Sequence, residues 1–104
     1  MRKIIKGLLY DTDTAECLYS WNNGYYGTDF KYRSKALFRT TKGNLFLYHS
    51  GGAMTDMRQT AGSNSWSGGE DIEPIDEKTA VKFLETHDGA DVIMSEFPDH
   101  YDEA

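Results

Sequence analysis

The chain has 104 residues, a net charge of −6, 38% hydrophobic residues and a single cysteine. This length suits one compact domain, and one cysteine excludes both an internal disulfide and a zinc site built from several cysteines. No apolar run approaches the ~18 residues of a membrane span, and the basic start lacks the apolar run of a signal peptide. We therefore expect one cytoplasmic domain, residues 1–104, that does not interact with membranes.

The charge is divided unevenly along the chain. Residues 1–69 carry nine basic and five acidic side chains, whereas residues 70–104 carry two basic and twelve acidic ones. A chain this short would then present one mixed or basic surface and one strongly acidic surface. Acidic surfaces repel nucleic acid and attract proteins that have cationic nucleic-acid channels. The charge pattern points to a protein partner rather than to a reaction.

The first part of the chain has the pattern of β-structure. Residues 3–6 predict a short strand, and residues 8–10 continue it past a glycine bend. Residues 11–14 (Asp-Thr-Asp-Thr) predict a turn, because short polar side chains bond their own backbone, or alternatively the cap of a brief helical turn. Residues 17–21 predict a second strand, which the Asn-Asn-Gly sequence at 22–24 ends.

A hairpin over residues 31–49 is the clearest predicted element. Residues 31–40 and 44–49 are rich in aromatic and aliphatic side chains that favour strands. They flank Thr41-Lys42-Gly43, and either Lys42-Gly43 or Gly43-Asn44 supplies the positive φ that a tight turn needs.

The segment 50–69 is rich in glycine and serine and predicts a long irregular loop, which Trp66 and two methionines pin to the core. Residues 72–75 then predict a last short strand. Its proline, Pro74, places it at an edge of the sheet, because proline cannot donate to a neighbouring strand.

The acidic region 76–98 predicts one or two helices. Asp76 is expected to cap a helix that runs to residue 88 and ends at Gly89, and a second short helix follows over residues 90–97 until Pro98 stops it. The elements together predict an α+β fold. Its mostly antiparallel sheet has four or five strands, with one or two C-terminal helices packed on one face.

The sequence assigns no catalytic residue, metal ligand or cofactor. His49, His87 and His100 are scattered singly, with no spacing typical of a metal site. Cys17 lacks a basic neighbourhood that would activate a thiol, so we expect a buried or half-buried structural cysteine. A metal-independent ribonuclease would need His49 to meet a lysine or arginine of the hairpin. The sequence alone does not show such a meeting.

The predicted hairpin is basic, and this suggests an alternative to a protein partner, namely a nucleic acid. At a period of two, Lys31, Arg33, Lys35 and Arg39 fall on one face, and Lys42 lies in the turn. Such a face could follow a phosphate backbone. The alternative is therefore an RNA-binding protein, or a metal-independent ribonuclease, that acts through residues 31–49.

Seven carboxylates form the candidate surface for a protein partner. They are Glu70, Asp71, Glu73, Asp76, Glu77, Glu85 and Asp88. A surface of this kind would mimic nucleic acid and dock in a basic channel, and electrostatic steering would make its association fast and sensitive to salt. Edge strands could also pair two copies, so a homodimer is compatible with the sequence.

Much of the chain carries a resemblance to known proteins. The segments are MRKIIKGLLYDTDTA (1–15), DF (29–30), LFRTTKG (37–43), LFLY (45–48), GGA (51–53), NSWSGG (64–69) and IEPI (72–75). They resemble a family of small proteins from mobile elements and phages of Gram-positive bacteria, and some small proteins of this kind are anti-CRISPR inhibitors of Cas9. The resemblance implies a non-enzymatic protein that acts in the bacterial host cell. It would bind Cas9 and block guide-RNA loading or nucleic-acid binding. The shared segments have the character of turns and core, so the resemblance assigns no functional residue.

Overall fold

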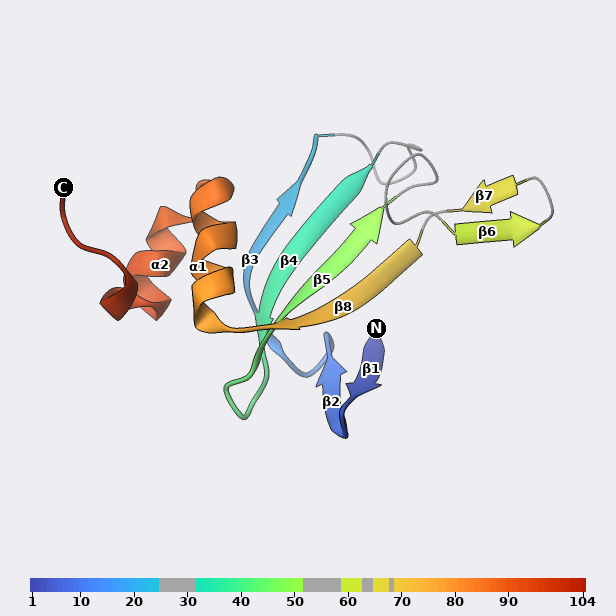
Figure 1. Cartoon of the computed structure of the whole chain (residues 1–104), viewed down its shortest axis with the longest axis horizontal. Helices are drawn as coiled ribbons and strands as arrows, with labels where there is room; N and C mark the ends of the chain where they lie inside the picture. Colours follow the sequence, from blue (N-terminus) through green and yellow to red (C-terminus); the bar gives the residue numbers. More distant parts are fainter. Residues whose placement is uncertain (25–31, 52–58, 63–64, 68) are drawn as a thin grey trace.

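The computed structural model describes residues 1–24, 32–51, 59–62, 65–67 and 69–104. Within these ranges the protein has a four-stranded antiparallel sheet, two separate two-stranded sheets and two α-helices near the C-terminus (Figure 1). The predicted α+β class is therefore confirmed.

The four-stranded sheet has the order β3-β4-β5-β8, with all neighbours antiparallel. Its strands are β3 (Glu16–Asn22), β4 (Arg33–Arg39), β5 (Leu45–Gly51) and β8 (Gly69–Ile75). The predicted hairpin is confirmed as β4–β5, with Gly43 at a φ of 90° in its turn. Strand β8 lies at an edge, as Pro74 predicts, but it begins three residues earlier than expected and so includes Glu70 and Asp71.

The N-terminal residues form a hairpin of their own. Strand β1 (Arg2–Ile5) pairs with β2 (Leu8–Asp11), so the prediction that residues 8–10 continue the first strand is wrong. The chain reverses because Lys6 and Gly7 both have positive φ, 52° and 79°, the conformation of a tight hairpin turn. Tyr10 anchors this hairpin: its ring and that of Phe46 form a T-shaped pair, with centroids 5.5 Å apart, on one face of the large sheet.

Helices cover the other face of that sheet. Helix α1 (Glu77–Thr86) and helix α2 (Ala90–Glu96) precede a 3-10 turn, η1 (Pro98–His100). The predicted cap is confirmed, since the Asp76 side chain accepts a hydrogen bond of 2.8 Å from the Thr79 N–H. The main core lies between helices and sheet, and its fully buried members include Leu37, Ala80 and Leu84.

Two further expectations fail within the described residues. The segment 50–69 is not wholly irregular, because β6 (Gln59–Gly62) pairs with β7 (Ser65–Ser67). The methionines expected to pin it lie outside the described residues, as does the Trp66 side chain. Cys17, on the edge strand β3, is exposed rather than buried or half-buried. None of the described helices combines the length and the apolar character needed to cross a bilayer.

Candidate functional site

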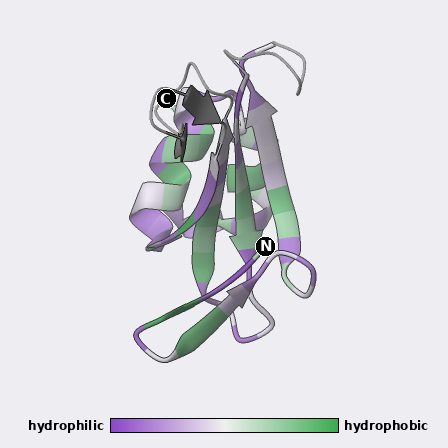
Figure 2. Ribbon diagram, turned by 90° about the vertical axis from the view of Figure 1, so that its right-hand side faces the viewer, coloured by the Kyte–Doolittle hydropathy of each residue, from purple (hydrophilic) through white to green (hydrophobic). Residues whose placement is uncertain are grey.

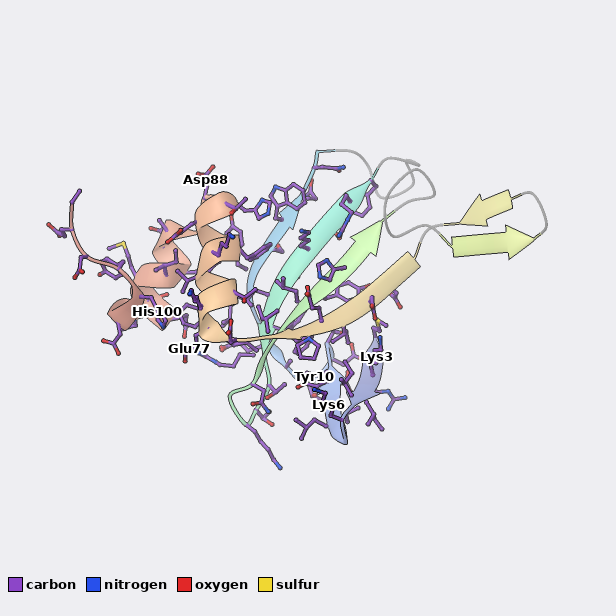
Figure 3. The ribbon with its side chains drawn as sticks, in the orientation of Figure 1. Lys3, Lys6, Tyr10, Glu77, Asp88 and His100 are labelled. Atoms are coloured by element: carbon purple, nitrogen blue, oxygen red, sulfur yellow. The ribbon has the colours of Figure 1, made fainter. Side chains whose placement is uncertain are left out.

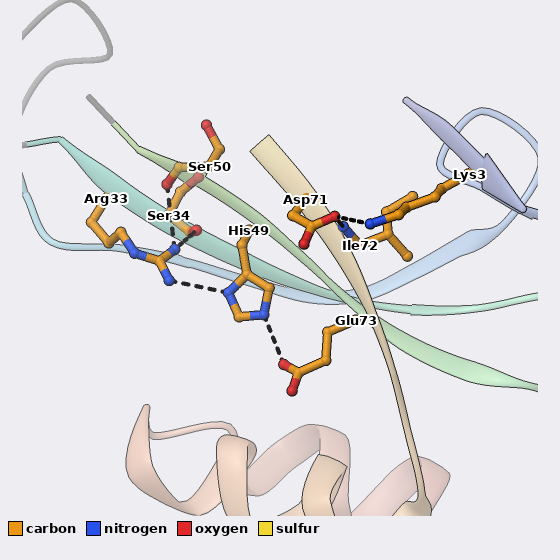
Figure 4. Close-up of polar contacts among 8 residues, drawn as sticks. All are labelled: Lys3, Arg33, Ser34, His49, Ser50, Asp71, Ile72 and Glu73. Carbon is orange, nitrogen blue, oxygen red and sulfur yellow. Dashed lines mark hydrogen bonds and ion pairs between the residues drawn. The ribbon is translucent and has the colours of Figure 1, made fainter. Parts of the chain in front are cut away.

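Three strands bring a histidine, an arginine and a carboxylate together. His49 on β5 lies between Arg33 on β4 and Glu73 on β8 (Figure 4). Arg33 Nη2 is 3.1 Å from His49 Nδ1, and His49 Nε2 is 2.9 Å from Glu73 Oε1. Guanidinium nitrogens only donate, so His49 Nδ1 accepts, and Nε2 carries the proton that it donates to Glu73. Both ring nitrogens of His49 are therefore engaged.

The environment of this network is that of a structural cross-strand link. The His49 side chain is only 14% exposed, whereas that of Glu73 is 58% exposed. Arg33 Nη1 also donates to the carbonyl oxygens of Ser34 (2.8 Å) and Ser50 (3.4 Å), so the guanidinium is held against the sheet. A general acid or base needs a nitrogen within reach of substrate, and in this arrangement His49 offers neither of its nitrogens.

The other basic residues proposed to bind nucleic acid differ in whether they are bonded within the protein. Lys35 lies directly opposite His49, and Lys42 is exposed in the β4–β5 turn, while Lys31 lies outside the described residues. Arg39 is held by two carboxylates, each at 2.8 Å, which raise the pKa of its guanidinium through hydrogen bonds. The structure thus commits Arg33 and Arg39 to contacts within the protein.

The two carboxylates that hold Arg39 come from different elements. Glu16 lies on β3 and Glu96 on α2, so the arginine joins the sheet to the second helix. Sequence reasoning did not assign a role to either carboxylate, since their approach to Arg39 depends on long-range packing.

The acidic side chains of β8 are also engaged within the protein. Asp71 accepts from Lys3 Nζ at 2.6 Å, and this hydrogen bond lowers the pKa of its carboxyl. Glu70 accepts the hydroxyl of Tyr48, and burial together with this carboxylate raises the pKa of Tyr48 to about 12. With Glu73 bonded to His49, all three β8 members of the predicted surface have internal partners.

The helices carry a larger and freer acidic group. We define the helical layer as residues 76–104, which contain nine acidic and two basic side chains. Three of the nine carboxylates are engaged: Asp76 caps α1, Glu77 bonds His100 at 2.9 Å, and Glu96 bonds Arg39. The other six are exposed and have no ion pair or side-chain hydrogen bond among the described residues. They are Glu85, Asp88, Asp91, Asp99, Asp102 and Glu103.

These carboxylates are spread over the whole helical layer. Figure 3 places Asp88 beyond one end of α1, and Glu77 and His100 near the other end. The two basic residues of the helical layer, Lys78 and Lys82, line a hollow beside α1 together with Glu85 and His100. The acidic side chains of β8 are exposed as well, so the predicted acidic residues lie on both β8 and the helical layer. The candidate site omitted four of the six free carboxylates of the helical layer, namely Asp91, Asp99, Asp102 and Glu103.

Comparisons provide no relative for this chain: no protein family, curated protein or solved structure matches it. Among the described residues, no group of three or more histidine, cysteine, aspartate or glutamate side chains is placed to hold a metal ion.

Proposed function

We propose that the protein binds another protein, and that its helical layer docks on a cationic surface that normally holds nucleic acid. The six exposed carboxylates without partners carry this proposal, because only two basic side chains, Lys78 and Lys82, share the helical layer with them, whereas Lys3 offsets the charge of Asp71 on β8. Together with the resemblance described above, this chemistry favours Cas9 as the partner and an anti-CRISPR-like block of guide-RNA loading or nucleic-acid binding.

The alternative of an RNA-binding protein or ribonuclease has less support. Arg39 is bridged by two carboxylates and both ring nitrogens of His49 are bonded, so the basic hairpin offers few free donors to a phosphate. A substrate would first have to break the bond between His49 and Glu73.

Binding to purified Cas9, with and without guide RNA, tests the proposal. The expected result is a complex with the guide-free enzyme whose affinity falls on the order of tenfold from low to high salt, because exposed charges are screened within about a Debye length. Absence of binding to either form at low salt would refute the proposal.

Charge-neutral variants locate the contact. Asp88 has a φ of 61°, a conformation that asparagine tolerates well, so Asp88→Asn removes one charge with little strain. We expect Asp88→Asn combined with Glu85→Gln to weaken binding severalfold, mainly by slowing association. Asp13→Asn is the one-charge control for Asp88→Asn alone, since Asp13 is exposed in the β2–β3 turn outside the helical layer. Equal effects of Asp88→Asn and Asp13→Asn would assign the binding to net charge alone.

Guide RNA alone provides the test of the alternative. A gel shift or cleavage of free RNA that is lost in His49→Ala would support the hairpin as the functional element instead. We expect neither.

A further inference from the structure

The N-terminal hairpin exposes an apolar face. Ile4 and Leu9 are directly opposite across β1 and β2, so their side chains lie on the same face, where they are 70% and 55% exposed. Leu8, beside the turn, is 49% exposed, although it lies opposite Ile5 on the face that also carries Tyr10. Figure 2 shows the hairpin projecting from the sheet, with hydrophobic colouring on both of its strands. The opposite face, with Tyr10, packs on the large sheet.

Cationic side chains flank this apolar face. Residues 1–10 contain three basic and no acidic side chains, and Asp11, which lies opposite Arg2, is only 9% exposed and accepts a hydrogen bond from the Asp13 N–H. Lys3 bonds Asp71, but Arg2 and Lys6 are exposed and form no ion pair among the described residues. We define the hairpin patch as Arg2, Ile4, Lys6 and Leu9. It combines apolar contact area with free positive charge.

The helical layer combines exposed apolar side chains with negative charge, the opposite charge to that of the hairpin patch. Among the side chains whose exposure is described, the remaining large exposed apolar ones are Met94 on α2 (56%) and Tyr101 just after η1 (43%). They lie along the chain between Asp91 and Asp102, in the region of free carboxylates described above. All the large apolar side chains that are described as exposed thus lie either on the N-terminal hairpin or in the helical layer, two regions of opposite charge.

The two regions cannot meet within one molecule. The hairpin packs on one face of the four-stranded sheet through Tyr10 and Phe46, while the helices pack on the other face through Leu37 and Leu84. Figure 1 likewise shows β1 and β2 separated from α2 by the sheet. Only a second molecule can bring an acidic helical layer to the hairpin patch.

We propose that the protein associates head to tail, with the hairpin patch of one copy docked on the helical layer of the next around Met94 and Tyr101. Such a contact uses two different surfaces, so it forms open chains or closed rings rather than a two-fold dimer. A few apolar side chains bury less than the ~800 Å² per partner of a stable interface. The association is therefore weak, with a dissociation constant in the micromolar range or above, and it is sensitive to salt.

Sedimentation of the purified chain, with no other protein present, tests this inference independently of the proposed function. We expect the average mass to rise with protein concentration at low salt, and the affinity to fall on the order of tenfold at high salt. A chain that stays monomeric from micromolar to millimolar concentration at low salt would overturn the proposal.

Complementary variants give the sharper test. Ile4→Thr/Leu9→Thr removes the hairpin patch, and Met94→Lys places a like charge in the helical layer opposite Arg2 and Lys6. Each variant alone is expected to stay monomeric. An equimolar mixture forms a one-to-one dimer and nothing larger, because each copy retains only one working surface. Ser20→Lys, on the exposed edge of β3, adds the same charge outside both regions and is expected to self-associate like the wild type.

Other outcomes would reject the head-to-tail contact. Self-association that persists in Met94→Lys would indicate pairing of two hairpins, and binding of the hairpin to anionic vesicles without self-association would indicate a lipid surface. Far-UV circular dichroism checks that each variant is folded. If the threonine pair disturbs the hairpin, Arg2→Glu/Lys6→Glu leaves the apolar residues in place and is expected to abolish association through charge.

Discussion

Gly89 controls how α2 follows α1, and replacing it provides a direct test of the packing. A Cβ atom at this position would lie 2.6 Å from Leu84 Cδ2, 3.0 Å from Leu84 Cβ and 3.2 Å from Leu84 Cα. Carbon atoms prefer separations of ~3.5–4.0 Å. Leu84 is completely buried, and its Cα belongs to helix α1, so neither the side chain nor the backbone can move away freely.

The magnitude of the Gly89→Ala effect follows from two opposing terms. Overpacking of this kind costs about 1–3 kcal/mol. The loss of unfolded-chain entropy on replacing glycine returns about 0.4–1 kcal/mol. We therefore expect a net loss of about 1–2 kcal/mol in the free energy of unfolding, and a fall in melting temperature of roughly 4–15 °C for a domain of this size.

Gly43 provides the matched control in urea unfolding followed by circular dichroism. At Gly43 the φ is 90° and no atom lies within 4 Å of the added Cβ, so alanine there is disfavoured by backbone conformation alone. Asparagine tolerates positive φ better than alanine, so Gly43→Asn should be more stable than Gly43→Ala. At Gly89 the order reverses, because asparagine is larger. The steric argument would be contradicted if Gly89→Ala were as stable as the wild type. It would also be contradicted if Gly89→Asn were more stable than Gly89→Ala.

Two further predictions concern charge. Removing the guanidinium with Arg39→Gln should lower the free energy of unfolding by ~1 kcal/mol. Of its two partners, Glu96 is 30% exposed and Glu16 is 63% exposed, so Glu96→Gln should destabilise the protein more than Glu16→Gln. Equal losses in the two glutamine variants would contradict this order. Burial, and secondarily Lys35, lower the pKa of His87. The folded protein thus favours the neutral His87 imidazole. The free energy of unfolding should therefore decline as the pH falls from ~6.5, the pKa of histidine in the unfolded chain, to the lower pKa of His87 in the folded protein. Imidazole titration by NMR checks this, and a midpoint at or above the unfolded value would disprove it.

Local signals predicted the elements that local chemistry determines. Gly43 in the β4–β5 turn and Asp76 at the start of α1 act on residues within a few positions of themselves. The N-terminal reversal was missed because Lys6 adopts positive φ, which lysine rarely does without support from the surrounding fold. The contact that holds this hairpin on the sheet, Tyr10 against Phe46, joins residues far apart along the chain.

The candidate site was harder to predict, because its contacts join distant strands. The network of Arg33, His49 and Glu73 depends on the pairing of β5 with β8, whose register no local pattern reveals. The count of acidic residues was readable from the sequence, but which carboxylates are free was not. Lys3 and Asp71 are 68 positions apart and meet only in the folded chain.

The two borders of the main sheet differ in their capacity to recruit foreign strands. On β8, Pro74 removes one backbone donor, and Glu70, Asp71 and Glu73 crowd the border with charge, features that deter an incoming β-segment. Strand β3 lacks proline and exposes Ser20 and Cys17, although a bulge near Leu18 interrupts its pairing. If a high protein concentration or partial unfolding leads to amyloid-like fibrils, β3 is the edge strand on which further strands would add.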